Sequence, residues 1–145
     1  MLDQDERNDL VPIHVFISTS YGSGKSSSLL PLLIEHLGHH GVSVIRTNEA
    51  TGVNGGAYPS FRRAISVSDI VIADITDHIP NVMYELGFAH ALRKPVLTLV
   101  RDGSEPVPED LQGFPFILYD PLNVGGLTQQ VDRWIARHSP VRSVA

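Results

Sequence analysis

Residues 69–91 read DIVIADITDHIPNVMYELGFAHA. Residues 70–75 form an almost continuously apolar run, which is typical of a β-strand covered on both faces of its sheet. Residues 82–92 follow with apolar side chains at helical spacing, so that Val82, Leu86 and Ala89 define one helical face. A buried strand followed by a helix is the repeating unit of parallel α/β proteins. This segment therefore predicts a parallel sheet.

The flanking sequence continues the same alternation of strands and helices. Further strands are expected at residues 13–17, 42–45, 95–100 and 114–119, and further helices at residues 26–37, 58–67 and 124–138. We therefore predict a flavodoxin-like three-layer sandwich, an α/β fold whose five-stranded parallel sheet has the order 2-1-3-4-5. A single domain is expected over residues 11–138, with flexible tails at residues 1–10 and 139–145.

The overall composition excludes several classes of function. The 145 residues suit one domain, and the lack of cysteine rules out disulfides and thiolate catalysis. With a net charge of −5, the chain lacks the broad basic surface that binds bulk nucleic acid. No apolar run approaches the roughly 18 residues of a membrane span, and the acidic N-terminus does not resemble a signal peptide. We expect a cytoplasmic protein that does not bind membranes.

In the predicted fold, ligands bind beyond the carboxyl ends of the strands, between the first and third strands. The loop after the first strand reads STSYGSGK over residues 18–25. Small residues, glycines and the start of a helix favour an anion in this position. The expected substrate- or phosphate-binding residues of the loop are Ser18, Ser20, Tyr21, Gly22, Ser23, Gly24 and Lys25.

The Gly-Lys-Ser triplet at residues 24–26 is also found in the Walker A motif of P-loop NTPases. That motif requires a glycine five residues before its final glycine, and Thr19 occupies this position. Two other interpretations of the loop stay open. It is either a serine-rich cap of the following helix or a phosphate or ribose cradle of another type.

Two carboxylates are the expected catalytic residues, Glu85 and Asp74. Glu85 lies on the flank of the apolar helical face, and Asn81 is the expected N-cap that places Glu85 near the first turn. Asn81 is also expected to contact the substrate. A carboxylate at this sheet edge can act as a nucleophile or stabilise charge at a sugar carbon. The alternatives are that Glu85 satisfies exposed helix amides and that Asp74 caps the following loop.

The seven histidines are not expected to form a metal site, because they match no recognised metal-binding pattern. His39 and His40 are interpreted as side chains that interact with the carbonyl groups at the end of a helix.

Residues 68–74 (SDIVIAD), 81–92 (NVMYELGFAHAL) and 94–96 (KPV) together resemble the nucleoside 2-deoxyribosyltransferase-like superfamily. That group includes deoxynucleoside monophosphate N-glycosidases, pyrimidine nucleotide hydrolases and TIR-like nucleotide-binding domains. The resemblance implies that Glu85 attacks the anomeric carbon and that the loop after the first strand holds the sugar or 5′-phosphate. It also implies a nucleotide-binding domain that needs no metal or organic cofactor and assembles as a homodimer or higher homo-oligomer.

The sequence departs from this superfamily at two positions. Phe61 stands where the deoxyribosyltransferases and glycosidases have a catalytic aspartate, and Ile79 stands where the transferases have a second one. Asp74 or Asp77 are the available substitutes. Nucleobase transfer is therefore disfavoured relative to hydrolysis or binding alone.

Three hypotheses follow from these residues. The leading one is a nucleotide N-glycosidase that releases the base from a nucleoside 5′-monophosphate or a related nucleotide. The second is a TIR-like module that binds a nucleotide or NAD with little or no turnover. The third is a P-loop phosphotransferase that depends on Lys25. The first two share a small-molecule nucleotide as partner, whose base and sugar the sequence leaves open.

Overall fold

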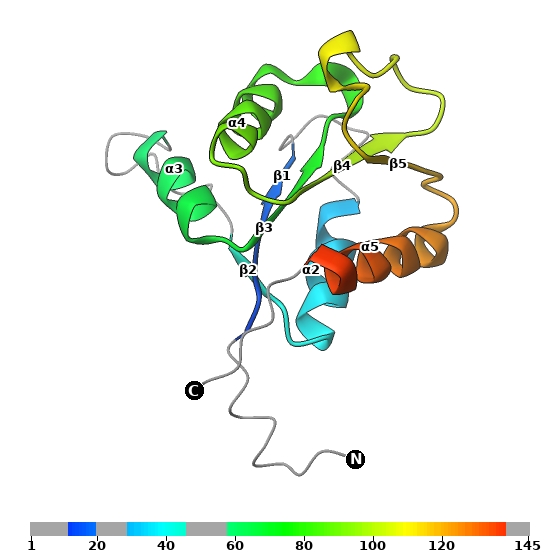
Figure 1. The fold of residues 1–145 in the computed structure, drawn as a ribbon. Helices are drawn as coiled ribbons and strands as arrows, with labels where there is room; N and C mark the ends of the chain where they lie inside the picture. The colour runs from blue at the N-terminus through cyan, green and yellow to red at the C-terminus, as the bar shows by residue number, and fades with distance from the viewer. Residues whose placement is uncertain (1–11, 20–28, 46–57, 139–145) are drawn as a thin grey trace.

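The computed structural model describes residues 12–19, 29–45 and 58–138 (Figure 1). Its centre is a five-stranded parallel sheet with the order β2-β1-β3-β4-β5, which confirms the predicted flavodoxin-like winding. The strands are β1 (His14–Ser18), β2 (Ser43–Ile45), β3 (Ile70–Asp74), β4 (Val96–Arg101) and β5 (Phe116–Tyr119). The helices are α2 (Leu29–His39), α3 (Tyr58–Val67), α4 (Pro80–Ala91) and α5 (Val124–His138), with short 3-10 turns η2 (Thr76–His78) and η3 (Glu109–Leu111).

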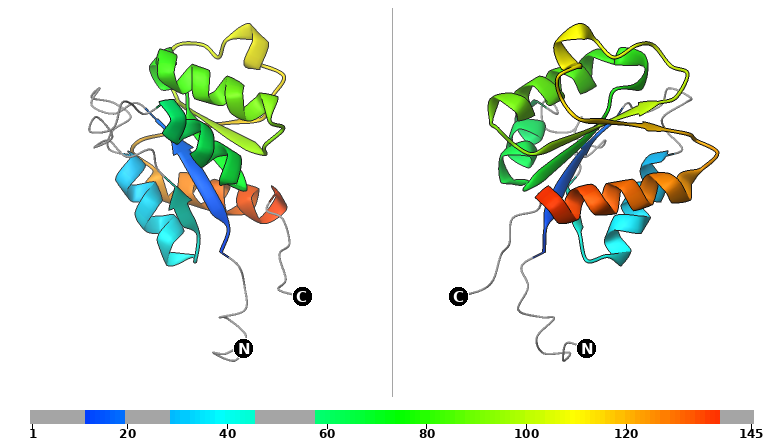
Figure 2. Two further views of the ribbon diagram at one scale, coloured as in Figure 1. Left: turned by 90° about the vertical axis from the view of Figure 1, so that its left-hand side faces the viewer. Right: turned by 45° about the vertical axis from the view of Figure 1, so that its right-hand side comes forward.

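The helices cover the sheet in two layers, as the views in Figure 1 and Figure 2 show. Helices α2 and α5 lie on one face, where Leu37 and Val131 are fully buried in the same apolar cluster. Helices α3 and α4 lie on the other face, where Ile65 and Ala89 are fully buried together. Each helix has an apolar stripe facing the sheet, and burying it is the main favourable term in folding.

Strand β3 is the middle strand, and all five of its residues are buried. Its parallel register pairs Ala73 with Ser18 of β1 and Asp74 with Leu99 of β4. The carboxyl ends of β1 and β3 therefore meet at one edge of the sheet. This is the edge at which the fold class binds ligands.

Helix α4 begins earlier than its apolar spacing indicates, at Pro80 rather than near Val82. The N-cap is Ile79, so the prediction that Asn81 caps the helix is wrong. A proline is favoured in the first helical position because its missing N–H would have no partner there and its fixed φ already suits the helix. Glu85 consequently lies in the second turn of α4 rather than near the first turn, where it was predicted.

The connection between β4 and β5 contains the short turn η3 and no α-helix. Phe116 and Leu118 of β5 are therefore exposed, while Tyr119 is buried on the α5 side of the sheet. No helix in the described ranges is both long enough and apolar enough to cross a membrane.

Candidate functional site

Glu85 and Ser18 meet at the carboxyl edge of the sheet. Ser18 ends β1 and is 1% exposed, and its hydroxyl donates a hydrogen bond to the Glu85 carboxylate. Helix α4 packs against both β1 and β3, which turns the flank bearing Glu85 toward the strand end. The structure thus joins two predicted site residues that are separated by 67 positions in the sequence.

The surroundings of Glu85 favour its neutral form. Glu85 is half-buried, and this burial raises the pKa of its carboxyl group, while the hydrogen bond from Ser18 lowers that pKa and partly offsets the rise. A carboxylate that is poorly hydrated and held by one donor is more reactive than a solvated one. It can attack an electrophilic carbon or stabilise a positive charge that develops nearby.

Thr19 adds an unsatisfied hydroxyl next to Ser18. Its side chain is 7% exposed, and its Oγ1 has no hydrogen-bond partner within the part of the chain that the structure describes. A buried hydroxyl without a partner costs about 1–3 kcal/mol, so a polar ligand atom at this position would be stabilised. In the sequence, Thr19 stood out only as a departure from the Walker A motif. Its place at the end of a buried strand was the signal available.

Asp74 ends β3, and its side chain forms hydrogen bonds with the turn that follows and with the end of β5. It is 5% exposed, and its two oxygens accept hydrogen bonds from the Thr76 amide at 3.0 Å and the Tyr119 hydroxyl at 2.8 Å. The Thr76 hydroxyl in turn accepts from the Arg101 amide at 2.9 Å. Burial raises the pKa of Asp74, and it also raises the pKa of Tyr119. These contacts are those of a loop cap, the alternative that the sequence left open.

The role of Asp74 can be tested by comparing two substitutions. Asp74→Ala is expected to lower the free energy of unfolding by about 2–3 kcal/mol, because Thr76 and Tyr119 lose their shared acceptor. Asp74→Asn is expected to lower it by less than about 1 kcal/mol, because the amide keeps the shape and buries no charge. Urea denaturation near neutral pH measures both changes. Equal losses in the two variants would contradict the capping role.

The turn between β3 and α4 has unusual backbone geometry. Asp77 and His78 are both in the left-handed region, with φ of 66° and 48°. Two consecutive residues other than glycine in this region are uncommon and are tolerated where the surrounding structure holds them. The exposed Asp77 contributes to the raised pKa of Asp74 by charge repulsion.

The other residues singled out in the sequence are Asn81, Phe61 and those of the loop after β1. Asn81 is exposed in the first turn of α4, and no hydrogen bond links its side chain to Glu85 among the described residues. Phe61 is 6% exposed and packs edge-on against Tyr84 and Phe88, with both ring centroids at 5.7 Å. The predicted loop residues Ser20, Tyr21, Gly22, Ser23, Gly24 and Lys25 lie outside the described residues.

Side chains that could hold a metal gather on α2, in the turn directly after it and on α5, rather than beside Glu85. They are His36, His40 and Asp132, the one such group that the described ranges contain. No metal site was predicted here, because His40 was interpreted only as a helix-end residue, although the four-residue spacing of His36 and His40 is visible in the sequence.

Solved structures of three kinds are similar to this chain. The CMP N-glycosidase BcmB of Clostridium botulinum has a TM-score of 0.62 at 20% identity, over 82% of this chain and 98% of that chain. A prokaryotic SEFIR domain has a TM-score of 0.59 at 19% identity, over 90% and 99% of the two chains. A response regulator receiver domain protein of Bacillus halodurans has a TM-score of 0.55 at 15% identity, over 90% and 100%.

No family model matches the sequence, and the search of curated proteins found no match. Similarity at 20% identity or below shows a common fold and no more. One of the three similar proteins is a nucleotide N-glycosidase, and the other two are a SEFIR domain and a response regulator receiver domain protein. The comparisons therefore place the chain among flavodoxin-like α/β proteins.

Proposed function

We propose that this protein is an N-glycosidase that releases the base from a nucleoside 5′-monophosphate or a related nucleotide. The observation that supports the proposal most is the Ser18–Glu85 pair at the carboxyl edge of β1 and β3. It presents a desolvated carboxylate where this fold class binds ligands. The Thr19 hydroxyl, which has no hydrogen-bond partner among the described residues, follows directly at the same strand end.

In the proposed reaction, the Glu85 carboxylate approaches C1′ of the sugar as the C1′–N bond breaks. The base leaves with the bonding electron pair and takes up a proton, while Glu85 either bonds to C1′ or stabilises the oxocarbenium ion. Water then adds to C1′ and loses a proton, which yields the sugar 5′-phosphate and restores the carboxylate. The loop after β1 would hold the 5′-phosphate.

The alternative is a module that binds a nucleotide or NAD with little or no turnover. The observation in its favour is that Phe61 and Ile79 are packed in apolar clusters, at positions where the resembled superfamily has carboxylates. The similarity to a SEFIR domain adds support at the level of the fold.

Incubation with a panel of nucleoside monophosphates and NAD, followed by chromatography of the free bases, tests the proposal. Release of a base from one monophosphate supports the glycosidase. Tight binding without released base over a long incubation supports the binding module. Magnesium-dependent hydrolysis of a nucleoside triphosphate that requires Lys25 would instead identify a P-loop phosphotransferase.

Removal of the Ser18 hydroxyl is expected to change the pH dependence of base release. In Ser18→Ala, nothing offsets the effect of burial, so the pKa of Glu85 should rise further. Because Glu85 acts as a carboxylate, activity is lost as the pH falls through its pKa, and the acid limb of kcat/KM should move to higher pH. Near pH 7, kcat/KM should also fall by about tenfold, the effect of one hydrogen bond to a charged group.

The matched control is Ser66→Ala on α3, whose hydroxyl donates to the Arg62 carbonyl at 2.6 Å. Its pH profile should equal that of the unmodified protein. An unchanged acid limb in Ser18→Ala would show that the hydrogen bond does not tune the catalytic group.

A further inference from the structure

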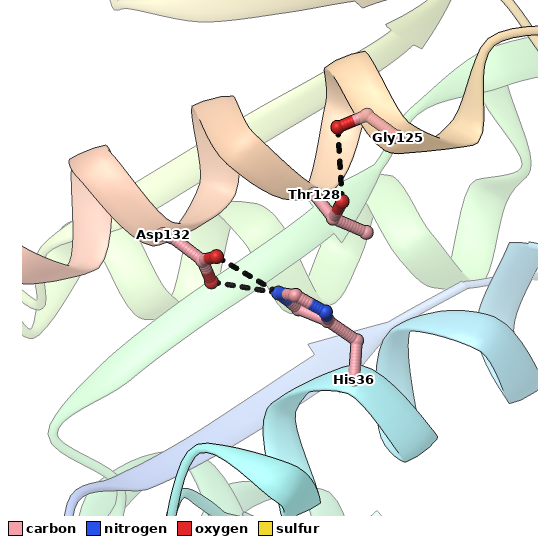
Figure 3. Close-up of polar contacts among 4 residues, drawn as sticks. All are labelled: His36, Gly125, Thr128 and Asp132. Atoms are coloured by element: carbon pink, nitrogen blue, oxygen red, sulfur yellow. Dashed lines mark hydrogen bonds and ion pairs between the residues drawn. The ribbon is translucent and has the colours of Figure 1, made fainter.

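Helices α2 and α5 face each other with two side chains in direct contact. His36 of α2 points at Asp132 of α5, and its Nε2 lies 2.8 Å and 2.9 Å from the two carboxylate oxygens (Figure 3). The side chains of His36 and Asp132 are 23% and 39% exposed. The pair is therefore shielded on its inner side and open to solvent on its outer side.

His40 adds a third donor group to this pair. It follows His36 by four residues and stands in the turn directly after His39, the last residue of α2. The rings of His36 and His40 lie 4.6 Å apart and are tilted by 53°, so they are not stacked face to face. One ligand atom from each of His36, His40 and Asp132 lies within 4.8 Å of the others.

We propose that His36, His40 and Asp132 bind a divalent transition-metal ion, with Zn²⁺ as the ion that suits them best. Two imidazole nitrogens and one carboxylate oxygen form a donor set typical of zinc, with water in the fourth position. Ca²⁺ and Mg²⁺ prefer sites built from oxygen atoms, so this group selects against them. The site is separate from the Ser18–Glu85 pair and does not depend on the proposed N-glycosidase activity.

The geometry needs only a small local change to accept an ion. Bonds of about 2.0–2.1 Å to zinc put neighbouring ligand atoms of a tetrahedral site roughly 3.3 Å apart. The Nε2 atom of His36 must therefore move away from the Asp132 oxygens by a few tenths of an ångström. The exposed His40 must approach them, and its side chain is free to change rotamer at the surface.

A bound ion would fasten α2 to α5 on one face of the sheet. In the absence of metal, the two helices are joined near this point by the His36–Asp132 contact and by the apolar cluster beneath it. An ion that binds the folded state and not the unfolded chain raises stability with the logarithm of its concentration relative to its Kd. The inferred role is therefore structural.

Zinc titration of the complete chain tests the site, after treatment with a chelator and removal of any histidine tag. We expect calorimetry near pH 7.5 to show one Zn²⁺ per chain and the melting temperature to rise with added zinc. Co²⁺ should give the visible absorption of a tetrahedral nitrogen and oxygen site. Binding should be at least tenfold weaker near pH 5.5, because imidazole binds metal only when neutral.

Variants separate the metal site from the interhelical hydrogen bond. His40→Gln keeps the His36–Asp132 contact, so a loss of zinc affinity of at least tenfold in this variant supports the three-ligand site. His36→Gln and Asp132→Asn should weaken binding by at least as much. The matched control is His39→Gln, because His39 is exposed and its Nε2 lies 3.8 Å from the Glu35 carboxylate outside the group. Zinc affinity that is the same in His40→Gln and His39→Gln, or no zinc binding in the unmodified chain, would overturn the proposal.

Discussion

Replacement of Glu85 by glutamine is expected to lower kcat for base release by about 10³-fold, while the protein stays folded. Glutamine has nearly the same shape, and its oxygen can still accept the hydrogen bond from the Ser18 hydroxyl. It cannot attack C1′ or neutralise an oxocarbenium ion. KM should change little, because the proposed role of Glu85 lies in the transition state rather than in holding the substrate.

The same substitution is expected to stabilise the fold at neutral pH. Burial raises the pKa of Glu85 in the folded state above its ordinary value of 4.5, so the folded chain binds its proton more readily than the unfolded chain does. The ionised form therefore weakens the fold at pH above the folded-state pKa. This penalty disappears as the pH falls through that pKa toward 4.5.

Thermal denaturation near pH 7 and near pH 4 measures this effect. Glu85→Gln should melt at a higher temperature than the unmodified protein near pH 7, and the difference should vanish near pH 4. Glu105→Gln is the matched control, because Glu105 is exposed on the loop between β4 and η3. Full base-release activity in Glu85→Gln would remove Glu85 from the mechanism, and a lower melting temperature at neutral pH would contradict its desolvation.

Substitution of Phe61 by aspartate is expected to unfold much of the protein rather than restore a catalytic carboxylate. Phe61 is 6% exposed and packs with Phe16, Ile65 and Ala89 between α3 and the sheet. Loss of the ring alone costs about 3–5 kcal/mol, and the buried charge adds to this. The total is comparable to the 5–15 kcal/mol that stabilises a typical domain.

Circular dichroism and urea denaturation measure the result, with two controls on the same helix. Phe61→Leu keeps the site apolar and should cost about 1–2 kcal/mol. Ser66→Asp introduces the same charge at an exposed position and should change stability by less than about 0.5 kcal/mol. A folded and more active Phe61→Asp would show instead that this position belongs to the catalytic site.

The fold was predictable because its signals are local and strong. The apolar run that became β3 and the helical spacing of α3 and α5 follow from side-chain periodicity alone. The rules of right-handed crossover connections leave only a few strand orders, and the structure has the one that was predicted. The start of α4 was predicted less well, since Pro80 and Ile79 extend the helix beyond its periodic part.

The candidate site was predictable only in part. The sequence identified Glu85 and Ser18 separately, through a helical phase and a strand end, and placed both at the ligand-binding edge, yet it did not predict the hydrogen bond between them. Their contact depends on how α4 crosses β1, which is set by packing between residues far apart in the chain. For the same reason Asp74 was open to two interpretations until Tyr119 of β5 was found bonded to it.

The amino-acid order is therefore sufficient for the alternating strands and helices of a parallel sheet, because these depend on patterns within short segments, and the edge at which ligands should bind follows from that fold class. The tertiary structure was needed for the Ser18–Glu85 pair, the unsatisfied Thr19 hydroxyl and the group of His36, His40 and Asp132. Each of these features arises where elements distant in sequence pack together. Such contacts depend on the position and orientation of whole helices, which local periodicity does not specify.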